Sequence, residues 1–244
     1  MSRERKPLHP LLLPIAAIQG ARVRQHGMRL PEAAGPRDGV VGALDGGSGE
    51  PLRVAVIGDS TAAGCGVEAQ SEAFGPQFAE AVAGRTGQPV EWAVRGRNGA
   101  RAFEVTRDVL PQLDDAPGGP QFDVVVVLVG VNDVLSGHQG SQWEQDLGAL
   151  LDGASAAADQ VLMTGIPEFS SFPALPKILA RYLDEQAARL DDISQQVCAD
   201  REVVTWLGAD MLATGKDFFA VDGFHPNADG YRRWAQAVAE NVNF

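Results

Sequence analysis

The stretch Arg53–Gly66, RVAVIGDSTAAGCG, decides the fold. Its apolar run Val54–Ile57 predicts a buried strand that ends at Gly58. The polar residues 59–61 and the small residues behind them predict a tight turn and then the N-terminus of a helix. A serine at such a turn points its hydroxyl past the end of the sheet, where unpaired helix N–H groups favour negative charge. Ser60 is therefore a candidate nucleophile, with a plain helix cap as the alternative.

Further apolar runs repeat this strand pattern along the chain. Residues 122–129, FDVVVVLV, are apolar without alternation, which is typical of a strand buried on both faces of a parallel sheet. Segments with apolar residues three and four apart, typical of helices, separate the runs. The expected strands are 54–57, 90–94, 122–129, 161–164 and 203–206, and the expected helices follow each of them, the last opening at Pro226. This order predicts an α/β fold, a three-layer α/β/α sandwich with a five-stranded parallel sheet.

Composition bounds the class of protein. The chain has 244 residues, of which 45% are hydrophobic and 21% charged, as in globular proteins. Its formal net charge of -12 argues against nucleic-acid partners, which need a positive surface. The only cysteines, Cys65 and Cys198, are too few for a disulfide framework and are expected to be free thiols. No metal-binding spacing accompanies them.

Residues 1–50 are expected to form an N-terminal basic arm and linker, followed by one domain at 51–244. Residues 1–30 hold six Arg or Lys against one Glu. The apolar patch Leu11–Ile18 allows a packed extension, partial disorder or peripheral contact with a membrane surface. Prolines near and inside it favour a packed extension or partial disorder over membrane contact, because proline interrupts an amphipathic helix. No apolar run is long enough to span a bilayer, and we expect a cytoplasmic protein, with secretion or membrane-surface association as alternatives.

The loops that follow the predicted strands carry the side chains that could take part in a reaction. Ligands of such sheets bind beyond the carboxyl ends of the strands, so these loops meet at one rim. We expect His225 to be the base that activates Ser60, since imidazole titrates at roughly pH 6.5 and suits proton transfer near neutrality. Asp222 lies three residues earlier and is placed to accept the Nδ1 hydrogen bond of His225, with helix capping as the alternative. The remaining histidines, His9, His26 and His138, are interpreted as solvated.

Acyl transfer also needs hydrogen-bond donors for the negative charge that develops on the carbonyl oxygen. The candidates for this oxyanion hole are the backbone N–H of Ser60, the backbone N–H of Gly99 and the side-chain amide of Asn132. A glycine lets a substrate approach the backbone closely. For Asn132 the alternative is a turn residue in a left-handed conformation.

Four sequence blocks resemble those of the SGNH, or GDSL-type, serine hydrolases. They are GDST at 58–61, RNGA at 97–100, GVND at 130–133 and DGFHP at 222–226. The resemblance implies a flavodoxin-like sheet, esterase or lipase activity and no cofactor. It also implies the following roles: Ser60 as nucleophile, His225 as base, Asp222 as its partner, and Gly99 and Asn132 in the oxyanion hole. Because Arg101 stands where the second block often continues with a small residue, Gly96 is the alternative to Gly99.

These features together predict a serine ester hydrolase that works through an acyl-enzyme on a small-molecule ester, acyl or lipid-like. The α/β-hydrolases are excluded, because the chain has no Gly-x-Ser-x-Gly elbow. The alternative function is a flavin- or phosphate-binding flavodoxin-like module without catalysis. Loop 165–176 carries Phe169, Phe172 and Leu175, which suit either an acyl pocket or ordinary packing. We interpret Arg95, Arg97 and Arg101 as a solvated face, with contact to an anionic headgroup as the alternative.

Overall fold

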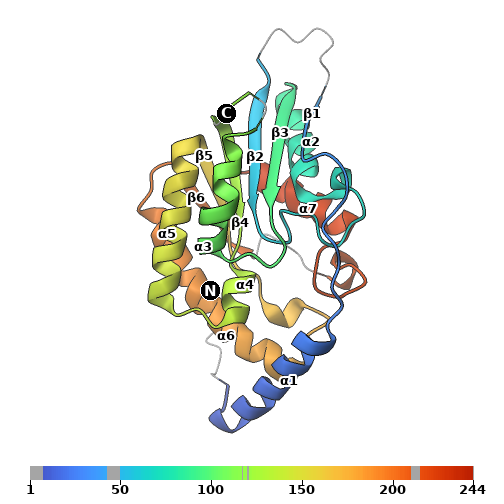
Figure 1. Ribbon diagram of the computed structural model, residues 1–244, viewed down its shortest axis with the longest axis vertical. Coiled ribbons are helices and arrows are strands. Elements are labelled where there is room, and N and C mark those ends of the chain that lie inside the picture. The colour runs from blue at the N-terminus through green and yellow to red at the C-terminus, as the bar shows by residue number, and fades with distance from the viewer. Residues whose placement is uncertain (1–7, 43–49, 117, 120, 210–214, 244) are drawn as a thin grey trace.

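A single mixed sheet lies at the centre of the molecule, with helices on both of its faces (Figure 1). The computed structural model describes residues 8–42, 50–116, 118–119, 121–209 and 215–243, and within them the sheet has six strands in the order β1-β3-β2-β4-β5-β6. The strands are β1 (Asp38–Val41), β2 (Leu52–Gly58), β3 (Val90–Gly96), β4 (Phe122–Leu128), β5 (Ala158–Thr164) and β6 (Val204–Leu207).

The five strands from β2 to β6 are parallel, as predicted. They lie in the order second, first, third, fourth, fifth, which is the flavodoxin-like order. The prediction of a wholly parallel five-stranded sheet was short by one strand. The sixth, β1, pairs antiparallel with β3 and comes from the segment that we had assigned to the arm. It has four residues, DGVV, too few to show a period in the sequence.

Helices α2 and α7 cover one face of the sheet, and α5 and α6 cover the other (Figure 1). The helix expected near Phe103 is irregular, because it starts as α3 and continues as a wider π turn and a tighter 3-10 turn. The α-helices are α1 (Leu13–His26), α2 (Phe74–Thr86), α3 (Ala102–Glu104), α4 (Val131–Ser136), α5 (Gly140–Ala157), α6 (Lys177–Ala199) and α7 (Ala228–Ala239). The irregular turns are Pro10–Leu12, Gln70–Glu72, Val105–Val109, Leu110–Leu113, Phe169–Ser171 and Lys216–Phe218.

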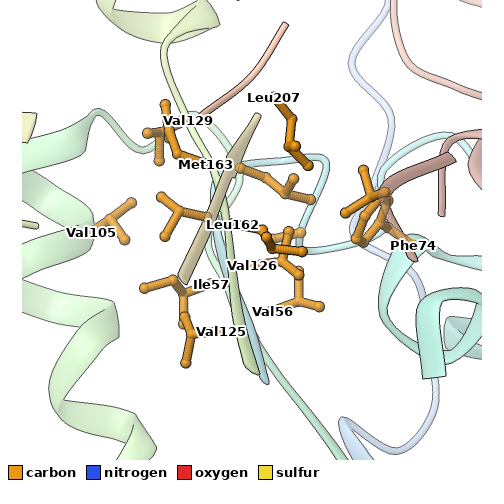
Figure 2. Packing of buried hydrophobic residues seen from close by; sticks show 14 of the residues in the cluster. Val56, Ile57, Phe74, Val105, Val125, Val126, Val129, Leu162, Met163 and Leu207 are labelled. Carbon is orange, nitrogen blue, oxygen red and sulfur yellow. The ribbon is translucent and has the colours of Figure 1, made fainter. Parts of the chain in front are cut away.

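The core lies on both sides of the central strands. Neighbouring residues of β2 point to opposite faces: Val56 points toward Phe74 of α2, and Ile57 toward Val105 (Figure 2). Residues 124–127 of β4 are at most 1% exposed, which agrees with the unalternating sequence of this strand. Burying each such side chain stabilises the fold by roughly 1.5–3 kcal/mol, so the strand ends that carry the site are held rigidly.

The N-terminal segment packs onto this core through α1 and β1. Ala16 of α1 is buried, and the backbone N–H of Leu179 in α6 donates to Gln19 Oε1 at 2.9 Å. Pro14 lies in the first turn of α1, a position that proline tolerates, so it does not interrupt the helix. Proline was therefore a poor reason to reject a continuous helix here. The division into an arm at 1–50 and a domain at 51–244 stays a prediction.

None of the helices in the described part of the chain combines the length and the apolar character needed to cross a bilayer.

Candidate active site

Ser60 lies in a series of turns directly after β2. The helix expected behind it is not formed, because residues 59–66 make turns and α2 begins only at Phe74. The N–H of Ala63 donates to Asp59 O at 3.0 Å, as in a helix, but Gly66 then turns the chain away with a φ of +109°. The predicted helix N-terminus behind Ser60 was therefore wrong, while the predicted strand and tight turn are present.

The structure brings Ser60, His225 and Asp222 together in one hydrogen-bonded chain. Ser60 Oγ lies 3.0 Å from His225 Nε2. On the other side of the ring, His225 Nδ1 lies 2.6 Å from Asp222 Oδ2. With the ring proton on Nδ1, Nε2 is left as an acceptor for the serine hydroxyl. This arrangement has the order of groups that activates a serine nucleophile.

A tight turn holds Asp222 under the histidine. Asp222 Oδ1 accepts the backbone N–H groups of Phe224 and His225, both at 3.0 Å. Burial by itself would raise the pKa of Asp222, but the hydrogen bonds from the His225 ring and these two N–H groups outweigh burial and lower the pKa below 3.8. Asp222 is therefore a carboxylate at neutral pH, able to orient the ring.

The serine turn and the histidine segment pack directly on each other. Gly66 approaches the chain at Pro226 so closely that a Cβ at this position would lie 2.1 Å from Pro226 O. The Tyr231 hydroxyl of α7 donates to Cys65 O at 2.7 Å. Helix α7 starts later than predicted, at Ala228, and Asn227 caps it by accepting the N–H of Gly230 at 2.8 Å. Asn227 therefore caps α7, while the carboxylate of Asp222 contacts the His225 ring.

Asn132 lies in the first turn of α4, after β4. Its side-chain amide donates to Asp59 Oδ2 at 3.2 Å and to Ala100 O at 3.1 Å. Asp59 is 2% exposed and also accepts the N–H and hydroxyl of Thr61, at 2.9 and 2.8 Å. Burial raises the pKa of Asp59. These hydrogen bonds and the nearby His225 lower it, but burial has the larger effect. Asp59 therefore connects the serine turn to Asn132, a function that the sequence analysis missed.

Gly99 lies in the loop that Asn132 contacts. It has a φ of +78° in a turn closed by the N–H of Ala100, which donates to Arg97 O at 3.1 Å. Within the described ranges no acceptor meets the N–H of Gly99. Gly96 differs, because it ends β3 in register with Gly58, and a Cβ there would lie 2.5 Å from the backbone N of Ala63. Gly96 is thus a packing position of the sheet.

A second polar cluster lies behind Asn132. Asp133 is 0% exposed, and its carboxylate oxygens accept the N–H of Ala102, both at 3.3 Å. Burial raises its pKa to about 7. His138 Nε2 lies 3.0 Å from Asp146 Oδ2 and 3.9 Å from Asp133 Oδ1, with a side chain only 9% exposed. His138 was therefore wrongly interpreted as solvated. Its partner Asp146 lies eight residues along, a spacing with no sequence signal.

An apolar pocket opens beside Ser60 and His225. Of the residues predicted for its wall, Phe172 lines it, whereas Phe169 and Leu175 are buried and outside the lining. The sequence analysis missed its other aromatic residues, which are Phe218, Phe219, Phe224 and Trp234. The ring centroid of Phe224 lies 4.9 Å from that of Phe172 and 5.2 Å from that of His225. The aromatic wall therefore continues onto the histidine.

The arginines near the rim are ion-paired. The interpretation as a solvated face was wrong for Arg95, whose side chain is only 10% exposed, whereas the side chains of Arg97 and Arg101 stay 40% and 35% exposed. Arg95 lies 2.8 Å from Asp38, Arg97 lies 2.5 Å from Asp108, and Arg101 lies 3.2 Å from Glu104. Both thiols, Cys65 and Cys198, are free and buried. Within the ranges that the structure describes, no three His, Cys, Asp or Glu side chains come together as a metal site would require.

Solved structures of esterases and lipases share this fold. AlinE4, described as an SGNH-hydrolase family esterase, is 20% identical with a TM-score of 0.58 over 80% of this chain and 97% of its own. A lipolytic protein of the G-D-S-L family from Veillonella parvula is 18% identical, with a TM-score of 0.59 over 78% and 97%. The psychrotrophic esterase EstA from Pseudoalteromonas sp. is 16% identical, with a TM-score of 0.57 over 78% and 95%.

Among curated proteins, none matches the sequence significantly. The sequence profile of the GDSL-like Lipase/Acylhydrolase family, in contrast, matches residues 56–233. This range begins in β2 and ends in α7, so it contains all four sequence blocks and the whole rim of the parallel strands. The chain therefore belongs to the GDSL-like lipase/acylhydrolase family, and it is a hydrolase that acts on ester bonds.

Proposed function

We propose that Ser60 hydrolyses carboxylic esters through an acyl-enzyme, with His225 as base and Asp222 as the group that orients it. The observation that carries this proposal is the hydrogen-bonded chain from Ser60 Oγ through the His225 ring to Asp222, beside an apolar pocket. Ser60 Oγ attacks the ester carbonyl while His225 Nε2 takes its proton and passes it to the leaving alcohol. Water deprotonated by His225 then attacks the acyl-enzyme, which releases the acid and frees Ser60.

Negative charge on the carbonyl oxygen would be stabilised by the N–H groups of Ser60 and Gly99 and by the amide of Asn132. The unpaired N–H of Gly99 supports its assignment over Gly96, which serves the sheet. Asn132 holds its amide between Asp59 and Ala100, so it would exchange the bond to Ala100 O for the oxyanion. Asp59 would keep the other N–H bond and with it the orientation of the amide.

We infer that the substrate is a small-molecule ester with an apolar acyl group. Four phenylalanine rings, Trp234 and the aliphatic side chains of Leu128, Val129 and Val131 line the pocket beside Ser60, so most of its wall is apolar. Two of these rings, Phe218 and Phe219, pack edge to face with centroids 5.2 Å apart. The flavin- or phosphate-binding alternative receives no support, because the helix N-terminus that would hold a phosphate behind Ser60 is not formed.

The test is hydrolysis of p-nitrophenyl esters with acyl chains from acetyl to palmitoyl, by the wild type, Ser60→Ala and Ser136→Ala. Ser136 is a matched control, since its hydroxyl also lies near a histidine but outside the pocket. We expect wild type and Ser136→Ala to turn over alike, and Ser60→Ala to lose on the order of a million-fold in kcat. Folded wild-type protein that cleaves no ester, or Ser60→Ala with wild-type rates, would contradict the proposal.

A further inference from the structure

Helix α1 has two opposite faces. Its inner face packs on α6, where Ala16 is buried and Gly20 lies against Leu179. Its outer face carries Ile15 and Ile18, which are 41% and 56% exposed. Leu11, in the turn before α1, is 78% exposed and continues the same line at a spacing of four residues. We call Leu11, Ile15 and Ile18 the α1 stripe.

Arginines without carboxylate partners follow the α1 stripe. Arg22 continues its line by four residues, and Arg24 and Arg29 come next. All three are exposed, and among the described residues none of them has a recorded ion pair. Several arginines of the domain are ion-paired instead, as Arg37 with Glu32 and Arg201 with Asp152 show. The positive charge of α1 is therefore available to an outside partner.

The α1 stripe lies at the same end of the molecule as the candidate active site. The parallel strands run toward the end where α1 is found, and their carboxyl ends carry the pocket (Figure 1). Helix α1 runs antiparallel to α6, with Gln19 bonded to Leu179 and the N–H of Leu8 bonded to Glu185. Helix α6 begins directly after loop 165–176, which supplies Phe172 to the pocket wall. A surface that contacts the stripe is thus brought near the pocket.

We propose that the α1 stripe and its arginines dock on an anionic lipid bilayer. Exposed Leu and Ile at helical spacing enter the boundary between headgroups and acyl chains, while flanking arginines contact lipid phosphates. The net charge of -12 comes from the rest of the chain, so an anionic surface repels the domain and attracts only this end. Charge thus orients the protein with the pocket end toward the lipid.

A bilayer fits the stripe better than a second copy of the chain. Stable protein interfaces bury about 800 Å² on each partner, far more than a single line of three side chains offers. Binding to a bilayer depends instead on the depth to which a few apolar residues enter and on the charge beside them.

The test is co-sedimentation of the full chain with vesicles of phosphatidylcholine alone or with one third phosphatidylglycerol. We compare wild type, Ile15→Asp/Ile18→Asp and Arg22→Glu/Arg24→Glu, with Val203→Asp and Arg189→Glu as controls. Val203 is 37% exposed and directly precedes β6, at the amino ends of the parallel strands. Arg189 is exposed on α6. Binding is scored without turnover, and Ser60→Ala is included, so the result is independent of the proposed ester hydrolysis.

We expect wild type, Ser60→Ala and both controls to bind anionic vesicles, and each double variant to bind at least tenfold less. Raised salt should weaken the wild-type interaction, because the arginine contribution is screened. Circular dichroism checks that each double variant is folded. The proposal would be overturned if wild type did not co-sediment with anionic vesicles, or if the double variants bound as well as wild type. A dimer that the isoleucine variant disperses, with no vesicle binding by wild type, would identify a second copy as the partner instead.

Discussion

Two histidines in this molecule lie between a serine hydroxyl and an aspartate. His225 lies 3.0 Å from Ser60 Oγ and 2.6 Å from Asp222. His138 lies 3.3 Å from Ser136 Oγ and 3.0 Å from Asp146. The three residue types and their distances are nearly the same in both places, so residue types alone do not make a reactive site.

The two places differ in what surrounds the serine. Ser136 ends α4 and donates its hydroxyl to Asp133 O at 2.9 Å, so its proton is engaged by the backbone. Ser60 follows a buried parallel strand and borders an apolar pocket, and its hydroxyl faces the Nε2 atom of a ring whose Nδ1 faces the carboxylate. Around His138 these ring nitrogens have the opposite roles. We conclude that strand, pocket and ring orientation distinguish the two sites.

Removing each histidine in turn is the strongest test of the difference between the two sites. We expect His225→Ala to lose on the order of a million-fold in kcat on the best p-nitrophenyl ester, because His225 is the base that hydrogen-bonds to Ser60 Oγ. His138→Ala should keep kcat within a few-fold and lose about 1–3 kcal/mol of unfolding free energy, since it removes a hydrogen bond to the buried carboxylate of Asp146. Equal losses of kcat in both variants would show that the distinction is false.

The two carboxylates can be compared in the same way. Asp222→Asn should lower kcat by about ten-thousand-fold, because an amide favours the wrong tautomer of the His225 ring. Asp146→Asn, at the matching position beside His138, should leave kcat unchanged. Steady-state kinetics of both variants, with circular dichroism to check folding, decides the matter. A fully active Asp222→Asn would contradict the orienting role.

Asn132 holds its side-chain amide between Asp59 and Ala100, beside the serine turn. Asn132→Ala should lower kcat by roughly a hundred- to a thousand-fold with little change in KM, as expected of a donor that acts in the transition state. Gln142→Ala is a suitable control, because Gln142 also donates an amide hydrogen to an aspartate, Asp146, at 2.9 Å. Normal kcat in Asn132→Ala would remove this residue from the oxyanion hole.

Asp133, which lies behind Asn132 and near His138, should have the smallest effect on turnover and act on stability instead. Burial raises its pKa to about 7, and His138, Asp59 and Arg101 also face it. A raised carboxyl pKa stabilises the fold at low pH, and this stability is lost as pH rises from 3.8 through about 7. While the native state holds one more proton, the slope is roughly 1.4 kcal/mol per pH unit.

Urea unfolding between pH 4 and 8 measures this slope. In Asp133→Asn the contribution should vanish, so the difference in unfolding free energy between variant and wild type should grow in favour of the variant as pH rises. Asp152→Asn, at an exposed aspartate, serves as control and should follow the wild-type curve. A difference between Asp133→Asn and wild type that does not change with pH would mean that Asp133 is ionised throughout this range.

The parallel sheet and the rim residues were readable from sequence because they depend on local signals. Apolar runs mark the strands, and Ser60, Asn132 and the pair Asp222 and His225 follow strand ends in chain order. The structure places these side chains close together, while their roles stay proposals.

The features that could not be predicted from the sequence depend on contacts between distant segments. Strand β1 exists only because β3 offers it an edge, and Phe218 joins the pocket through packing rather than through any period. His138 finds Asp146 across a turn between two helices. Such pairings arise from tertiary packing, which overrides local preference.

The hydrogen bond between Ser60 and His225 joins residues 165 positions apart in the chain. On a ribosome that adds about 5–20 residues per second, Ser60 is therefore made on the order of ten to thirty seconds before His225, its proposed base. The contact of Tyr231 with the serine turn forms later still, because α7 follows His225 in the chain. Under the proposed mechanism the growing chain therefore carries an unactivated serine until His225 and α7 have been made and have packed on the turn after β2.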